Sequence, residues 1–178
     1  MAVIYVGRPA VDRSSSTTAG FTMVNQGLVA DGSGIINTVG FYNYSILTGT
    51  VVIIFEQVDA THLTARSFVE IADVAAGSEQ IITVDKLGNA ISLPIEIGDL
   101  IGFYSATGLC RCATSGFDNV LYTQFDQRAC VNKAFSSYAE DCMSMYGTGA
   151  TVAVGIKWNG VTITKWNGQV ITKLNGLP

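Results

Sequence analysis

The sequence predicts an all-β protein, an antiparallel β-sandwich followed by a C-terminal β-meander or repeat tail. Short runs rich in Val, Ile, Phe, Tyr and Thr follow one another from residue 2 to about residue 102, each bounded by Gly, Asn, Asp or Ser. No stretch of ten or more residues shows a persuasive helical period of about 3.6. The chain then ends in octads that contain Asn-Gly, a strong signal for two-residue hairpin turns between alternating β-forming residues.

Seven strands are expected in the body of the chain. They cover residues 2–6, 20–24, 34–44, 50–57, 62–71, 80–84 and 100–105. Turn residues separate them, as in Asp31-Gly-Ser-Gly34, which lacks the further acids of a calcium loop and is therefore interpreted as a turn. Ile97-Gly-Asp99 predicts a sharp turn into a late strand, and residues 133–141 are the best candidate for a short helix.

The C-terminal octads read Lys157-Trp-Asn-Gly160-Val-Thr-Ile-Thr164, then Lys165-Trp-Asn-Gly168-Gln-Val-Ile-Thr172, then Lys173-Leu-Asn-Gly176-Leu-Pro178. The turn glycines are Gly160, Gly168 and Gly176. Two-residue turns predict a meander of residues 151–158, 161–166 and 169–174, with Trp158 opposite Val161 and Trp166 opposite Gln169. An octad also suits a β-solenoid or an interchain stalk, and these alternatives stay open.

One face of the predicted meander is apolar and needs a cover, because a small meander is barely stable alone in water. We therefore expect the tail to serve assembly or anchoring. The residues assigned to this role are Trp158, Val161, Ile163, Trp166, Val170 and Leu174. Charge also sets the tail apart, since residues 1–150 hold fourteen acids and seven bases (−7) whereas residues 151–178 hold three Lys and no acid (+3).

Composition limits the classes of function. The chain has 178 residues, of which 48% are hydrophobic and 13% charged, which suits one compact domain of residues 1–150 with a small appendage and excludes disorder. A net charge of −4 argues against nucleic acid as a ligand. The longest apolar run, Val51-Val-Ile-Ile-Phe55, is far shorter than the about 18 residues that cross a membrane, and its β-branched residues predict a buried strand. No export signal is expected at the N-terminus.

Candidate chemistry is sparse. The single histidine, His62, stands near Asp59 and Thr61 in a segment that reads as a turn between strands, so we expect a structural or exposed side chain and no catalytic role. Two acids could in principle form a glycosidase pair, but no acid lies in a motif that raises its pKa. No catalytic residue, metal ligand or cofactor is assigned.

Four cysteines, Cys110, Cys112, Cys130 and Cys142, fall within one stretch. Cys110 and Cys112 share a strand face, which favours pairing with Cys130 and Cys142 over pairing with each other. Free buried thiols, disulfides and, least favoured, a zinc site remain as alternatives.

Residues 105–149 form the longest region without clear patterning, and sandwiches carry recognition in such loops. Aromatic residues are frequent there. Tyr122, Tyr138 and Tyr146 are the candidate contacts for a glycan, with ordinary core packing as the favoured interpretation.

The order of motifs resembles a family of jelly-roll-like β-sandwich proteins encoded by tailed bacteriophages and phage-rich environmental sequences. The motifs are Tyr5-Val-Gly-Arg-Pro-Ala-Val-Asp-Arg13, Thr18-Ala-Gly-Phe-Thr22, Gly34-Ile-Ile-Asn-Thr-Val39, Ala75-Ala-Gly-Ser-Glu-Gln80, Ile97-Gly-Asp-Leu-Ile-Gly-Phe-Tyr104, Met145-Tyr-Gly-Thr-Gly149 and the Lys-Trp-Asn-Gly octads. The resemblance spans nearly the whole chain and implies a jelly-roll-like fold and a virion structural role, as a capsid decoration, head-fibre or tail-associated protein. It supplies no catalytic residues.

We therefore expect a non-enzymatic virion protein that is made in the host cytoplasm, without nucleic-acid or membrane partners. Its expected partners are other copies of itself, with a trimer favoured, other virion proteins and, as the alternative function, a host surface glycan bound by loops 105–149.

Overall fold

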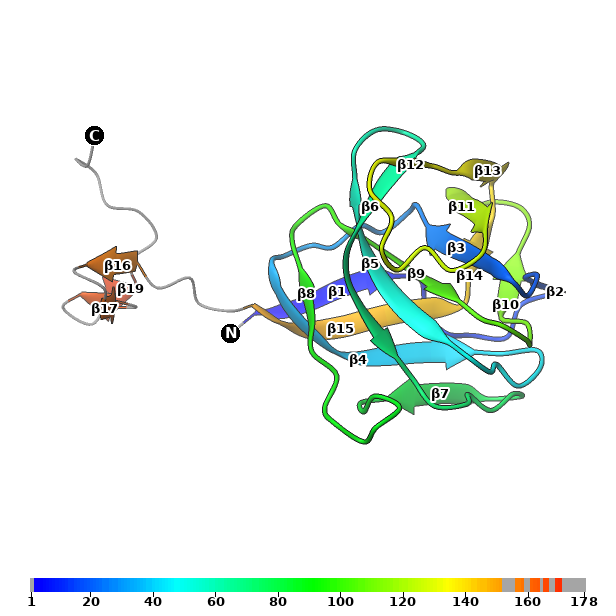
Figure 1. Ribbon diagram of the computed structural model, residues 1–178, viewed down its shortest axis with the longest axis horizontal. Helices are drawn as coiled ribbons and strands as arrows, with labels where there is room; N and C mark the ends of the chain where they lie inside the picture. Colours follow the sequence, from blue (N-terminus) through cyan, green and yellow to red (C-terminus); the bar gives the residue numbers. More distant parts are fainter. Residues whose placement is uncertain (1, 152–155, 159–160, 164, 167–168, 171–178) are drawn as a thin grey trace.

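The fold is all-β and antiparallel, as the sequence predicts (Figure 1). The structure, a computed structural model, describes residues 2–151, 156–158, 161–163, 165–166 and 169–170. These residues contain no helix. Accordingly, the described part of the chain has no helix of the length and apolarity needed to span a membrane.

A five-stranded sheet forms one layer of the sandwich. Its order is β1 (Val3–Gly7), β15 (Met145–Thr151), β4 (Gly34–Tyr42) and β7 (Glu79–Ile82), and β8 (Leu93–Ile95) also pairs with β4. The N-terminal strand therefore pairs with a strand almost at the end of the body, with Val3 opposite Ala150. A register shift lies between Thr148 and Gly149, where β15 meets β4.

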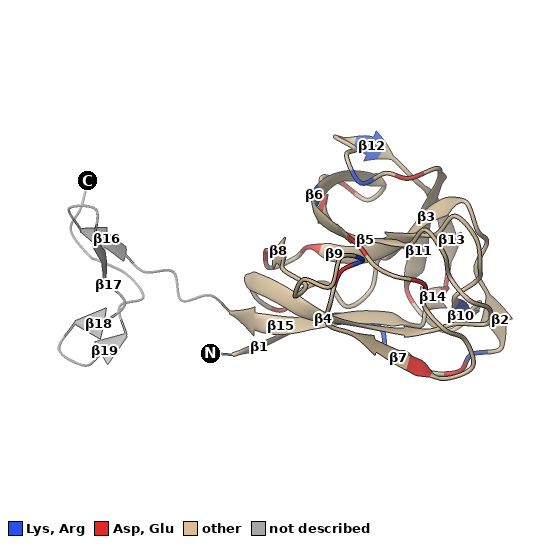
Figure 2. Cartoon of the chain, turned by 60° about the horizontal axis from the view of Figure 1, so that its bottom comes forward, with Lys and Arg blue, Asp and Glu red and all other residues tan. Residues whose placement is uncertain are grey.

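A seven-stranded sheet forms the second layer. Its order is β12 (Lys133–Ala134), β6 (His62–Glu70), β5 (Val51–Gln57), β9 (Leu100–Tyr104), β3 (Phe21–Asn25), β11 (Asn119–Gln124) and β13 (Ser136–Ala139). Figure 2 shows the two layers edge on, with the five-stranded sheet at the bottom. A small sheet of β14 (Cys142–Met143), β10 (Arg111–Ala113) and β2 (Ser15–Ser16) lies at one end.

The main core lies between the two large sheets. Alternate residues of the strands point into it, which is why Ile4 and Val6 of β1, Ile36 of β4 and Val52 and Ile54 of β5 are fully buried. Phe41 and Phe103 meet there edge to face, with ring centroids 5.5 Å apart.

A second core lies on the other face of the seven-stranded sheet. Val51, Ile53 and Phe55 of β5 point into it, so every residue of the run Val51–Phe55 is buried. Phe135 covers this core and meets Phe55 edge to face, with centroids 5.8 Å apart. Phe135 is also the single residue between β12 and β13, which pair with opposite ends of the sheet. The sheet is therefore nearly closed on itself around this core.

All seven expected body strands are confirmed, with ends that differ by at most two residues. The helix expected at residues 133–141 is wrong, because these residues form β12 and β13. Pairing with β6 and β11 supplies the backbone hydrogen bonds that a helix would otherwise have supplied internally. The sequence interpretation also missed β2, β8, β10, β11, β14 and β15 as strands.

The tail residues that the structure describes form two antiparallel pairs. β16 (Ile156–Trp158) pairs with β17 (Val161–Ile163), with Trp158 opposite Val161, and β18 (Lys165–Trp166) pairs with β19 (Gln169–Val170), with Trp166 opposite Gln169. Both registers are those that the Asn-Gly spacing predicts. The expected continuous strand 161–166 is instead divided between the two pairs, because each octad pairs the residues on either side of its own Asn-Gly.

Candidate functional site

His62 belongs to the turn that joins two strands. It follows the turn from β5 to β6, where Asp59 Oδ1 accepts hydrogen bonds from the backbone N–H groups of Thr61 and His62, each at 2.8 Å. The His62 ring nitrogen Nδ1 lies 3.0 Å from the same oxygen. The hydrogen bond from Thr61, followed by those from His62, lowers the pKa of Asp59 to about 2. This cluster closes the hairpin turn, the structural role expected for it.

The four cysteines are free thiols and lie in three separate places. Cys110 is fully buried in the main core, whereas Cys130 packs against the second core, on the opposite face of the seven-stranded sheet. Cys112 and Cys142 lie on the paired strands β10 and β14. Burial is the main cause that raises the pKa of all four thiols, so they are protonated and weak nucleophiles at neutral pH.

Within the described residues, no three His, Cys, Asp or Glu side chains come together as a metal-binding group. The Asp31 turn has structural contacts instead. Asp31 Oδ1 accepts a hydrogen bond from the Tyr5 backbone N–H at 2.9 Å, and Ser33 Oγ accepts one from the Ile97 N–H at 2.9 Å. The turn thus ties β1 to the β8–β9 connection, which agrees with its interpretation as a turn.

Two of the three tyrosines singled out in the sequence come together. Tyr122 of β11 and Tyr138 of β13 stack with ring centroids 4.0 Å apart and planes 12° from parallel. Phe21 of β3 lies on the neighbouring strand, 6.2 Å from the Tyr122 ring. Tyr138 is the outermost ring, and 45% of its surface is exposed. We call Phe21, Tyr122 and Tyr138 the aromatic stack.

Tyr146 lies elsewhere, on the outward side of the five-stranded sheet. Its ring stacks on Tyr5, with centroids 5.7 Å apart and planes 10° from parallel. It also lies flat over Gly40 of β4, where an added Cβ would come within 2.1 Å of the ring. The Tyr146 hydroxyl donates a hydrogen bond to Glu79 at 3.0 Å. The predicted trio of tyrosines is therefore split between two surfaces.

Tyr5 and Tyr146 belong to a wide surface that we call the open face, the side of the five-stranded sheet that points away from the main core. The register of the strands places these residues on it: Val3, Tyr5, Ile35, Thr38, Gly40, Tyr42, Glu79, Ile81, Pro94, Tyr146, Thr148 and Ala150. Among these positions Glu79 is the only charged residue. No further sheet of the described body packs on this side (Figure 2).

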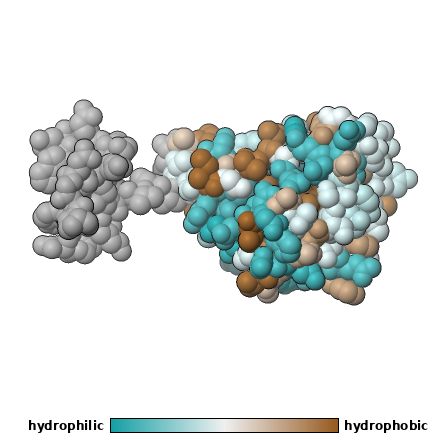
Figure 3. Space-filling model, turned by 90° about the horizontal axis from the view of Figure 1, so that it is seen from above, coloured by the Kyte–Doolittle hydropathy of each residue, from teal (hydrophilic) through white to brown (hydrophobic). Residues whose placement is uncertain are grey.

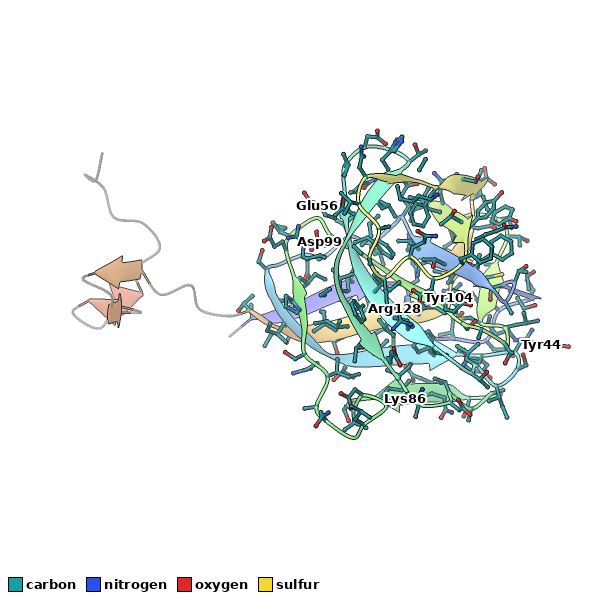
Figure 4. All side chains as sticks on the ribbon, in the orientation of Figure 1. Tyr44, Glu56, Lys86, Asp99, Tyr104 and Arg128 are labelled. Atoms are coloured by element: carbon teal, nitrogen blue, oxygen red, sulfur yellow. The ribbon has the colours of Figure 1, made fainter. Side chains whose placement is uncertain are left out.

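The seven-stranded layer carries two groups of ion pairs. Arg66 of β6 donates from Nε to Asp99 Oδ2 at 2.6 Å and from a terminal nitrogen to Asp99 Oδ1 at 3.2 Å. Glu96 and Glu56 flank the guanidinium at 3.2 and 3.6 Å. Glu56 and Asp99 lie on the same side of the fold in Figure 4. Burial raises the pKa of Asp99, and the hydrogen bonds from Arg66 oppose that shift.

A second ion-pair group fastens residues 125–135 over the seven-stranded sheet. Arg128 binds Asp126 and Glu70, and its guanidinium lies 5.3 Å from the centre of the Phe68 ring. Arg128 and Lys86 are labelled in Figure 4; Lys86 approaches Glu70 at 3.9 Å. The ion pairs of Arg128 therefore hold residues 125–135 in place over the sheet. On the side of the molecule that Figure 3 shows, apolar side chains form separate brown patches among teal ones.

The residues assigned to assembly lie in the tail. Trp158, Val161, Ile163, Trp166 and Val170 fall within β16–β19. Leu174 and the turn residues Gly160, Gly168 and Gly176 lie outside the described residues.

The sequence interpretation missed the open face because β15 was not recognised as a strand. The alternation that would have revealed it is present in β1 and β4, where Tyr5, Thr38 and Tyr42 alternate with fully buried residues. Phe21 was likewise not singled out, because its pairing with β11 is a long-range contact.

The chain was compared with protein-family models, with curated proteins and with solved structures. None of the three comparisons finds a match.

Proposed function

We propose that this chain is a non-enzymatic virion structural protein, a jelly-roll sandwich that self-associates and docks onto a particle through its C-terminal octads. The order of its strands carries the proposal. A jelly roll is the double-sheet fold of many viral capsid domains and lectins. The family resemblance of the sequence motifs points in the same direction.

The jelly-roll assignment is supported by four strand pairs. A jelly roll is a long antiparallel hairpin rolled up, so the first strand pairs with the last, the second with the next to last, and so on inward. Taking β1, β3, β4, β5, β6, β8, β9 and β15 as the eight strands, the four required pairs are β1–β15, β3–β9, β4–β8 and β5–β6. All four are present. The additional pairs β4–β15 and β5–β9 join them into two sheets, as rolling the hairpin requires.

Self-association is supported by surface chemistry. An exposed sheet face with one charged position among Tyr, Thr, Ile, Val, Gly, Ala and Pro is unusual for a protein that stays monomeric in water. A basic tail with three Lys on a body of net charge −7 adds attraction between copies. Closed symmetric assemblies are the common outcome for such chains, and we favour a trimer.

Particles from a host culture that carries the gene test the virion role. Density-gradient fractions would be examined by mass spectrometry and by immunogold electron microscopy with an antibody against the body. We expect the protein to sediment with particles and to label them at regularly repeated positions. Its absence from purified particles, while it is abundant in the soluble lysate, would contradict the proposal.

Glycan binding is the second candidate, favoured by the aromatic stack. The outer ring face of Tyr138 is available to a sugar ring, because Tyr122 occupies only its inner face. A glycan array with the full chain tests this. We expect Tyr138→Ala to abolish binding and Tyr44→Ala, which removes an exposed tyrosine from the loop after β4, to leave it unchanged. Absence of any array signal, or equal binding by both variants, would rule this function out.

A further inference from the structure

The open face lacks a cover in the described residues of one chain. Val3 is 76% exposed and Ile81 is 63% exposed, although both lie in strands and are apolar. Tyr5 and Tyr146 stack on each other on the same face, with Gly40 beneath the Tyr146 ring. In contrast, the outer face of the seven-stranded sheet is covered by residues 125–135, of which Phe135 is buried in the second core. The outer side of the seven-stranded sheet is thus covered, whereas the outer side of the five-stranded sheet is not covered by the described residues.

The tail needs a surface of this kind. Its octads place apolar residues at alternate positions, with Trp158, Val161 and Ile163 on one side of the sequence pattern and threonines on the other. The described tail strands pair only with one another, as β16–β17 and β18–β19. A two-stranded pair is marginal in water unless its apolar side packs on a further layer.

We propose that the open face of one copy is covered by the octad tail, residues 152–178, of a second copy. Two sheets pack face to face at about 10 Å when their inner sides are apolar and interdigitate. The tail would thereby add a third layer to its neighbour's sandwich. This inference rests on the proposed self-association and names the surface and the segment that perform it.

Charge agrees with this occupant. The tail carries Lys157, Lys165 and Lys173 and no acid, and the strand positions of the open face include no Lys or Arg that would repel them. Glu79 is exposed on the open face. Asp31 lies next to this face, where its carboxylate accepts a hydrogen bond from the Tyr5 backbone N–H. A second copy of the body would instead bring its own net charge of −7 against the first.

A tail that covers a neighbour's open face makes a head-to-tail contact between copies. The tail leaves the body at Thr151, the last residue of β15, which lies between β1 and β4 in the same sheet. Each copy then uses its tail as donor and its open face as acceptor, a head-to-tail contact. Such a contact gives a ring if the rotation between copies closes, which agrees with the proposed trimer.

Substitutions on the open face give the first test. We expect the full chain with Val3→Arg and Ile81→Arg to dissociate at concentrations at least about tenfold higher than the unmodified chain, because two unpaired charges would be buried. The matched control carries Val131→Arg and Leu87→Arg, two exposed apolar residues at other surfaces (79% and 85%). Light scattering over a dilution series measures assembly, and thermal unfolding confirms that each variant folds.

Zero-length cross-linking gives the second test. Carbodiimide joins Lys amines to carboxylates in contact, and mixing ¹⁵N-labelled with unlabelled full chain separates links between copies from links within one. We expect Lys157, Lys165 or Lys173 to link to Glu79 or Asp31 of another copy. Links from these lysines only to carboxylates away from the open face, such as Glu56 and Glu140, or only within one chain, would overturn the inference.

The two proposals fail in different ways. If the chain assembles, but the open-face variant assembles like the control and the cross-links map elsewhere, the inference is wrong and self-association stands. If the chain is monomeric at every concentration and forms no links between copies, both self-association and the inference are wrong. The virion role would then be decided by the particle fractions alone.

Discussion

Gly149 shows how a single residue fixes the packing of the five-stranded sheet. A Cβ added at this position would lie 1.9 Å from the Ile35 carbonyl oxygen and 2.7 Å from Ile36 Cα. The contacts are with backbone atoms, which cannot rotate away. Only glycine therefore allows β15 to lie so close to β4 beside the register shift.

Replacing Gly149 by Ala should destabilise the protein by about 1–3 kcal/mol or more, because the strands must separate to admit the methyl group. Denaturant unfolding of the full chain measures the effect. Gly32→Ala is the control, since its added Cβ would meet nothing nearer than 3.5 Å and its φ is ordinary. Equal stability of the two variants would contradict the close approach.

Asp59 provides a pH prediction at the same scale. Its folded pKa of about 2 lies below the value of about 3.9 for an unfolded Asp, so its contribution to stability is present above pH 4 and is lost as the pH falls toward 2. Carboxyl NMR titration should show Asp59 ionised at pH 3. Asp59→Asn should remove this part of the acid dependence of unfolding; a titration midpoint near 4 would refute the hydrogen-bonded turn.

At the residue scale, much was predictable from local signals. Val51–Phe55 was expected to be buried because it is an unbroken β-branched and aromatic run, and His62 was expected to be structural. In contrast, β15 was not recognised as a strand, because Gly147 and Gly149 weaken its strand pattern. Glycine is required at these two positions because Ile101, Ile36 and Ile35 pack closely against them, a contact that only the folded structure reveals.

At the scale of elements, the pair β12–β13 depends on Phe135. Residues 133–141 were expected as the best candidate for a short helix. In the structure Phe135 points into the second core, while Tyr138 joins the aromatic stack on the opposite face of the sheet. Partners on β6 and β11 decide this conformation, and they are distant in sequence.

Truncating Phe135 to Ala should cost about 3–5 kcal/mol, because its ring is 5% exposed and packs edge to face on Phe55. Hydrogen exchange should also show faster exchange in β12 and β13 than in β5. Val131→Ala, in the same covering segment but exposed, should change stability little. Unchanged exchange of β12 and β13 in the Phe135 variant would contradict their dependence on this ring.

The ion pair of Arg66 with Asp99 joins β6 to the turn before β9. Asp99→Ala should destabilise by about 3–5 kcal/mol, because it leaves Arg66 without its buried bidentate partner and the Glu96 N–H without an acceptor. Glu56→Ala should cost less than about 1 kcal/mol, since that carboxylate is half exposed and 3.6 Å away. Chemical denaturation of both variants measures the difference.

At the scale of the whole molecule, the sequence predicted the class of fold and seven strands of the body, but not the remaining strands or their order. Alternation and turn residues are local, whereas the pairing of β1 with β15 joins residues separated by nearly the whole body. The open face as one continuous surface follows from that pairing, so neither its extent nor the split of the tyrosine trio could be predicted from the local alternation in β1 and β4. The registers of the tail pairs were predictable because both partners lie within one octad.

The order of pairing during refolding should reflect these distances. We expect pulse-labelled hydrogen exchange to find the amides of the β5–β6 hairpin protected first and those of β1 protected last, because closing the longest loop has the largest entropic cost. Protection of β1 before or together with β5 would contradict this order.

The same long-range pairing has a consequence for biosynthesis. β1 leaves the ribosome before every other body strand, and its partner β15 is synthesised last of them. At roughly 5–20 residues per second, β1 waits on the order of 10–30 seconds for that partner. During this interval β1, which carries Ile4 and Val6 on its inward side, has no strand to pair with in its own sheet. A nascent chain of this protein is therefore a natural client for chaperones that hold exposed apolar strands until β15 has been synthesised.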